Sequence, residues 1–141
     1  MLDLQTISDR IEIDDLITRY TRSVDTLDWE RFKTVFTPDA TIDYTGSGGL
    51  KGTRDEMQEW LAETLPMFSK MQHYVCQKEV TIDGDTAVAR VYLFNPMVIT
   101  QPDGSEWRME VGGSYLHQLV RTPEGWRSRE LVEEIIWDRK D

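Results

Sequence analysis

The chain has 141 residues, with 16 Lys and Arg against 26 Asp and Glu, so its formal net charge is −10. A chain of this length is expected to form one domain over residues 1–141, with a core that needs no disulfide or metal. The negative charge argues against nucleic acid or an anionic membrane surface as the partner, since both would repel it. The single cysteine, Cys76, cannot form an internal disulfide, and the N-terminus has no export signal, so we expect a cytoplasmic protein.

Helical spacing dominates the first half of the chain. Ser8 is the predicted N-cap of a first helix, and Asp28 can cap a short second one. Thr53 and Glu56 form a capping box for a third helix that ends at Pro66. A short strand over 40–44 and a glycine-rich surface turn over 46–49 are expected between the second and third helices. The apolar stripe of the first helix runs through Ile13, Leu16, Ile17, Tyr20 and Val24.

From Met71 onward the apolar period changes to two, which predicts four consecutive antiparallel strands joined by turns at 83–85, 102–104 and 123–125. Helices followed by a meander are typical of an α+β domain with the helices on one face of a sheet. Strands this long must bend to stay compact, and Gly112-Gly113 and Asn95-Pro96 are the predicted bends. We therefore expect three helices across the concave face of a strongly curved sheet that encloses a cavity.

The sequence contains no nucleotide-binding glycine loop, no zinc-ligand spacing and no nucleophile elbow, so we expect neither a cofactor nor a metal. Four polar residues nevertheless lie at positions where a purely structural role does not easily explain their residue type. Tyr20 lies on an apolar stripe, and Asp25 lies at a helix C-terminus, where the macrodipole disfavours a carboxylate. Tyr44 ends a short strand, and His73 stands near the start of a long one. Each also has a structural interpretation, as a packed tyrosine, a capping carboxylate or a hydrogen-bonded histidine.

These residue types together suit proton-transfer chemistry. A carboxylate beside a histidine fixes the imidazole tautomer and stabilises the imidazolium that forms when the ring takes a proton. Two tyrosine hydroxyls can polarise a carbonyl or hold a leaving hydroxyl. The set therefore favours proton abstraction next to an activating group, followed by elimination or double-bond migration.

The element order resembles that of the SnoaL-like branch of the NTF2-like superfamily, which also holds scytalone dehydratase. The resemblance implies an α+β, NTF2-like cone whose sheet is mixed or antiparallel. The spacing of the four polar residues is most similar to that of bile-acid 7α-dehydratases, which implies His73 as the base and Asp25 as its orienter. It implies Tyr20 and Tyr44 as acid or water-holding groups. Short phrases also carry the likeness, namely Trp29-Glu30-Arg31-Phe32, Phe36-Thr37-Pro38-Asp39-Ala40, Asp83-Gly84-Asp85-Thr86-Ala87 and Gly125-Trp126-Arg127.

Two positions depart from the dehydrochlorinases of this superfamily. Tyr20 stands where they have a lysine, and Leu131 stands where they have an arginine, which disfavours loss of a halide here. Strand alternation predicts a mostly apolar wall suited to a ring-shaped, sparingly oxygenated compound. His117 is expected either on that wall or facing solvent. The predicted substrate-binding residues are Asn95, Tyr115, Phe36, Trp60, Phe68, Leu93, Leu131, Glu133 and His117.

The leading hypothesis is a cofactor-independent dehydratase acting on a cyclic hydroxylated steroid-, terpenoid- or polyketide-like substrate. The alternatives are a double-bond isomerase of the ketosteroid isomerase type and a non-catalytic module that binds a small molecule. The expected partner is a small apolar cyclic substrate, with no nucleic acid and no membrane. A homo-oligomer is also expected, formed through the convex sheet face that carries Tyr92 and Phe94.

Overall fold

The computed structural model describes residues 1–141. Its three α-helices precede most of its strands in the sequence. The helices are α1 (Leu4–Asp25), α2 (Trp29–Lys33) and α3 (Arg54–Thr64), and two 3-10 turns are η1 (Thr45–Ser47) and η2 (Leu65–Met67). The strands are β1 (Phe36–Asp43), β2 (Lys51–Thr53), β3 (Lys70–Met71), β4 (Tyr74–Asp83), β5 (Thr86–Thr100), β6 (Glu106–Thr122) and β7 (Gly125–Lys140).

The helix caps follow the predicted chemistry in two of three places. Asp28 accepts a hydrogen bond from the backbone of α2, and Thr53 caps α3, as expected. The prediction for α1 is wrong, because Asp3 and not Ser8 is the N-cap; its carboxylate accepts from the backbone N–H of Thr6. The helix therefore begins about one turn before the predicted start, because the Asp3 cap lies outside the apolar stripe on which the prediction was based.

All strands belong to one mixed sheet with the order β2-β1-β7-β6-β5-β3, and β4 also pairs with β5. The meander from β4 to β7 is antiparallel, as predicted, whereas β1 adds to β7 in parallel. The sheet is mixed, within the expected mixed or antiparallel class, but the sequence did not specify this pair of strands, because no local turn signals a contact between segments so far apart. The sheet does not close into a barrel.

The two predicted bends turn out differently. The register of β6 against β7 shifts between Gly112 and Gly113, which confirms a bulge there. At Asn95-Pro96 there is no bulge, since β5 pairs with β6 without a shift. The pairing is interrupted on the other side of β5 instead. There β4 pairs with β5 as far as Phe94, and β3 pairs with it from Met97 onward. The gap between β3 and β4 is the segment that carries His73.

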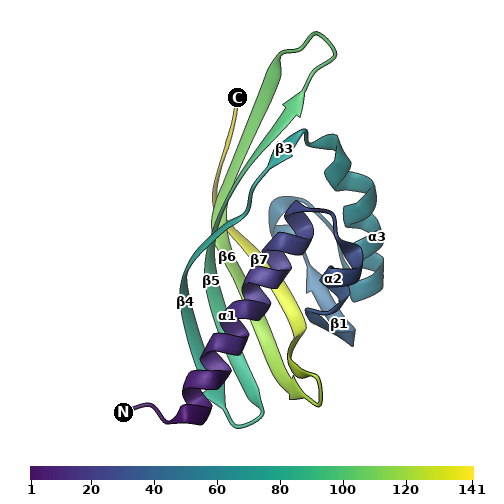
Figure 1. Cartoon of the computed structure of the whole chain (residues 1–141). Helices are drawn as coiled ribbons and strands as arrows, with labels where there is room; N and C mark the ends of the chain where they lie inside the picture. Colours follow the sequence, from purple (N-terminus) through teal and green to yellow (C-terminus); the bar gives the residue numbers. More distant parts are fainter.

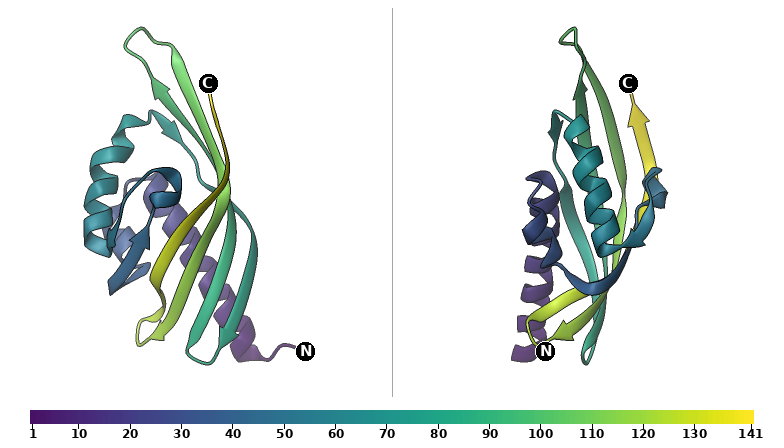
Figure 2. Two further views of the ribbon diagram at one scale, coloured as in Figure 1. Left: turned by 180° about the vertical axis from the view of Figure 1, so that it is seen from behind. Right: turned by 90° about the vertical axis from the view of Figure 1, so that its right-hand side faces the viewer.

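Helices α1 and α3 lie on the same face of the curved sheet, and the hairpin of β5 and β6 extends beyond them (Figure 1). The other face is uncovered by helices in the turned views (Figure 2). Its exposed aromatic side chains include Tyr92, and Phe94 stacks between Tyr74 and Trp137 at centroid distances of 5.7 and 5.9 Å. The dimer expected through this face stays a prediction. No helix is long and apolar enough to span a bilayer.

Candidate active site

A pocket of about 630 Å³ lies between the concave sheet face, α3 with η2, and the loop around η1. Helix α1 lines it only through its last turns, and the projecting β5–β6 hairpin supplies the far wall. The lining is mostly apolar, with a few polar groups. The polar side chains on its wall are Tyr20, Tyr44, Ser47, Thr64, His73, Asn95, Tyr115, Glu133, Asp138 and Lys140.

Asp25 and His73 form a hydrogen-bonded pair at one side of this pocket. The Asp25 Oδ1 atom lies 2.6 Å from His73 Nδ1, and the backbone N–H of His73 donates to both carboxylate oxygens at 3.0 and 3.2 Å. These donors compensate a carboxylate placed at the negative end of α1. Only 12% of the Asp25 side chain and 8% of the His73 side chain are exposed. The contact holds the imidazole in place and leaves its other nitrogen, Nε2, for the pocket that His73 lines.

Tyr20 and Tyr44 form a second hydrogen-bonded pair, with their hydroxyl oxygens 2.7 Å apart. Burial raises the pKa of both phenols well above the ordinary value. The ring of Tyr115 packs edge-on against Tyr20 at a centroid distance of 5.2 Å. The phenols therefore stay protonated: one donates to the other, and the O–H that remains is a fixed hydrogen-bond donor rather than a group that gives up a proton outright.

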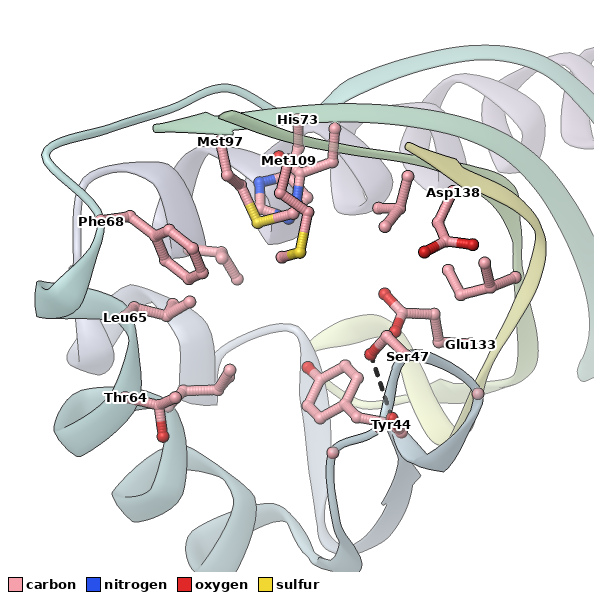
Figure 3. A pocket seen from close by; sticks show the side chains of 18 of the residues that line it. Tyr44, Ser47, Thr64, Leu65, Phe68, His73, Met97, Met109, Glu133 and Asp138 are labelled. Atoms are coloured by element: carbon pink, nitrogen blue, oxygen red, sulfur yellow. Dashed lines mark hydrogen bonds between the residues drawn. The ribbon is translucent and has the colours of Figure 1, made fainter. Parts of the chain in front are cut away.

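Two buried acceptors on the wall have no donor from the protein. They are Oδ1 of Asn95 on β5 and Oε1 of Glu133 on β7. Asn95 is 6% exposed and Glu133 is 9% exposed. Burial is the main cause that raises the pKa of Glu133, and the hydroxyls of Ser47 and Tyr115 and the nearby His73 partly offset it. Figure 3 shows the Glu133 carboxylate pointing into the open centre of the pocket, on a different wall from His73.

The structure brings most of the predicted site residues together. The four predicted catalytic residues meet in two hydrogen-bonded pairs. Of the predicted binding residues, five lie on the pocket wall and four lie in the core beneath it, because α1 crosses that part of the concave face. Those on the wall are Trp60, Phe68, Asn95, Tyr115 and Glu133. Those in the core are Phe36, Leu93, Leu131 and His117.

His117 is fully buried, so the alternative that it faces solvent is wrong. Its Nδ1 lies 2.9 Å from the Ser128 hydroxyl, and the ring packs edge-on against Tyr20, 5.9 Å between centroids. Tyr20 thus separates His117 from the pocket. Burial without a charged partner lowers the pKa of His117 to about 4.

Sequence reasoning missed two parts of the wall. Met97, Ile99, Trp107 and Met109 line the pocket from the projecting hairpin. Carrying the strand alternation two steps beyond Asn95 would have identified Met97 and Ile99, and carrying it two steps back from Val111 on β6 would have identified Met109 and Trp107. The second part is the glycine-rich turn, expected at the surface.

This turn lines the pocket because η1 packs against β7. A Cβ atom on Gly46 would lie 2.4 Å from the backbone oxygen of Glu133, so only glycine permits the close approach. The loop in turn holds Ser47, whose hydroxyl donates to the carbonyl of Tyr44 (3.1 Å; Figure 3). No sequence signal we used distinguishes such a loop from a solvated turn.

The family model described as "SnoaL-like domain" matches residues 5–132. The chain belongs to this family. The SnoaL-like chain is 39% identical over 133 residues to the uncharacterized protein Rv2910c of Mycobacterium tuberculosis, which covers 94% of this chain and 89% of the relative.

Two solved structures share the SnoaL-like fold. The Kfla4162 protein of Kribbella flavida superposes with a TM-score of 0.85 at 26% identity, covering 95% of each chain. The hexachlorocyclohexane dehydrochlorinase of Novosphingobium barchaimii superposes with a TM-score of 0.82 at 17% identity, covering 99% of this chain and 94% of that one. At 17% identity, the second likeness is one of fold alone.

Proposed function

We propose that this SnoaL-like protein is a cofactor-independent lyase that eliminates water from a cyclic hydroxylated compound bearing a nearby carbonyl. One observation carries the proposal: Asp25 holds Nδ1 of His73 at 2.6 Å on the wall of a mostly apolar pocket. A neutral imidazole held by a carboxylate in this way is a general base, and its Nε2 is the proton acceptor.

In the proposed reaction Nε2 of His73 removes a proton from the carbon next to the carbonyl. The electrons of that C–H bond form the new double bond, and the C–O bond to the hydroxyl on the adjacent carbon breaks. Asp25 stabilises the imidazolium that results. In the pair formed by Tyr20 and Tyr44 one hydroxyl donates to the other, and the O–H that remains donates a hydrogen bond to the oxygen on which negative charge develops.

The wall supports the substrate class. Aromatic and aliphatic side chains such as Trp60, Phe68 and Ile135 suit fused rings of steroid, terpenoid or polyketide type. The unpartnered Oδ1 of Asn95 can accept a hydrogen bond from a substrate hydroxyl. We favour loss of water over loss of halide because the pocket wall has no arginine, and its one lysine, Lys140, lies near the end of β7.

The test uses the purified protein in deuterium oxide with a fused-ring ketone that carries a hydroxyl on the carbon β to the carbonyl. We expect the ultraviolet band of the conjugated enone to appear. Deuterium incorporation next to the carbonyl without loss of the hydroxyl would indicate a double-bond isomerase instead. A ketone that quenches the fluorescence of Trp60 and Trp107 but is neither dehydrated nor deuterated would contradict both enzymes and indicate a binding module.

A further inference from the structure

Elimination of water needs a proton for the departing hydroxyl as well as a base for carbon. Hydroxide is a poor leaving group at neutral pH, and a positioned acid that protonates it contributes about 10²–10⁴ in rate. The group must reach the pocket and be able to release a proton. The candidates on the wall are the tyrosines, Asp138, Lys140 and Glu133.

The tyrosines are poor proton donors here. Tyr20 and Tyr44 hydrogen-bond to each other, and burial opposes formation of either phenolate. Asp138 and Lys140 lie in the last residues of β7, where both side chains are more than half exposed. Side chains this exposed keep their hydration and are not held in a fixed position against a bound substrate.

Glu133 differs from all of these. Its side chain is nine-tenths buried, it points into the pocket, and its Oε1 has no hydrogen-bond donor from the protein. Burial favours the protonated carboxylic acid. The groups that face it are His73, with Asp25 behind it, the three tyrosines of the wall, and the two charged residues further along β7. The one permanent cation among them is Lys140, which is more than half exposed and lies 3.8 Å from Asp138. The hydroxyls of Ser47 and Tyr115 and the nearby His73 offset the effect of burial on the pKa of Glu133 only in part.

We propose that Glu133 is the proton donor to the departing hydroxyl, from a wall of the pocket different from the one that carries the base His73. The inference rests on the function proposed above and assigns the general acid of that reaction. His73 gains the proton from carbon, and Glu133 loses its proton to the hydroxyl, which leaves as water. The imidazolium and the carboxylate are restored through exchange with solvent, so no other reactant is consumed.

The proposal also specifies the substrate. The hydroxyl that leaves must reach the β7 wall while the acidic C–H bond faces the gap between β3 and β4. An anionic group on the substrate beside that hydroxyl would lose its hydration in this mostly apolar pocket, and it would be repelled by the carboxylate that Glu133 becomes after proton transfer. The expected substrates are therefore uncharged around the departing hydroxyl.

The experiment compares two ketones that give the same enone, one with a hydroxyl and one with acetate on the β carbon. Acetate leaves without a proton, so the acid is needed only for the hydroxyl compound. We expect Glu133→Gln to slow elimination of the hydroxyl compound by about 10²-fold or more and elimination of the acetate by less than about threefold. His73→Ala slows both, because both need the base.

Glu134→Gln is the matched control, because Glu134 is the next residue of β7, lies outside the pocket and pairs with Arg90. Folding of Glu133→Gln is checked by thermal unfolding at pH 8. Its unfolding temperature should be no lower than that of the wild type, since the change removes a carboxylate that burial disfavours.

The possible outcomes separate this inference from the proposed function. An equal loss on both ketones would make Glu133 a structural residue and overturn the inference. Full activity of Glu133→Gln on both, with His73→Ala inactive, would also overturn it and leave the lyase intact. Full activity of His73→Ala on both would refute the lyase itself, and the inference with it.

Discussion

The two histidines of the chain are both largely buried, yet they are suited to opposite tasks. His73 has a carboxylate on Nδ1 and lines the pocket, whereas His117 has only the Ser128 hydroxyl on Nδ1 and lies in the core. Tyr20 stands between them, with its hydroxyl toward Tyr44 and its ring against His117.

The contrast shows that burial alone does not make a histidine a base. Desolvation lowers the pKa of His117 to about 4, so it stays neutral and has no proton to exchange near neutral pH. The carboxylate beside His73 supplies what His117 lacks, which is stabilisation of the imidazolium after proton transfer. Partner chemistry and access to the pocket therefore distinguish the two.

The largest expected effect on activity comes from replacing Asp25, the carboxylate partner of His73. Asp25→Asn should lower kcat for elimination by about 10²–10⁴-fold with a much smaller change in KM, since the amide neither fixes the tautomer nor stabilises the imidazolium. Steady-state kinetics on the β-hydroxyketone measure it. Asp14→Asn is the control, because Asp14 is on the same helix but pairs with Lys78 at the surface (2.8 Å). Equal rates for wild type and Asp25→Asn would contradict the assigned roles.

The second prediction concerns His117 and stability. Because its folded-state pKa of about 4 lies below the ordinary value of 6.5, the unfolded chain binds its proton first, and stability is lost as pH falls from about 6.5 to 4. The loss should approach about 3 kcal/mol, at 1.36 kcal/mol per pKa unit. Urea unfolding at pH 7, 6, 5 and 4.5 measures it for the wild type and for His117→Leu. The variant should show a flatter pH dependence, and parallel curves would show that His117 is not responsible.

A smaller effect is expected at the tyrosine between the two histidines. Tyr20→Phe removes the hydroxyl that pairs with Tyr44 but keeps the ring against His117. The dependence of stability on acid pH should therefore be unchanged. The free energy of unfolding should fall by about 1 kcal/mol, because pocket water can replace the lost hydrogen bond. The same urea series provides both numbers. A changed acid dependence would mean that the phenol hydroxyl, and not the burial of the ring, controls His117.

The sequence predicted the class of fold and the four residues of the two hydrogen-bonded pairs, for identifiable reasons. Capping residues and apolar periods are local signals, so α2, α3 and the meander could be located. Tyr20 and Asp25 stood out because a polar group on an apolar stripe or at a helix C-terminus needs a partner, and each has one.

The features that failed depend on contacts between distant segments. The parallel pairing of β1 with β7 and the packing of the glycine loop on Glu133 leave no local pattern. Strand alternation placed Leu93 and Leu131 on the correct face and left His117 open between that face and solvent, but it could not show which part of the face α1 covers. The interruption between β3 and β4, which decides where His73 lies, was not predicted, because His73 was expected near the start of a continuous strand.

The most direct test of the central claim is the initial rate of enone formation from the β-hydroxyketone by wild type and by His73→Ala, at equal enzyme concentration and pH 7.5. General-base catalysis by His73 predicts a fall of about 10²–10⁴-fold in the variant. The circular dichroism spectrum should be unchanged. A rate within about threefold of the wild type would contradict the assignment of His73 as the base.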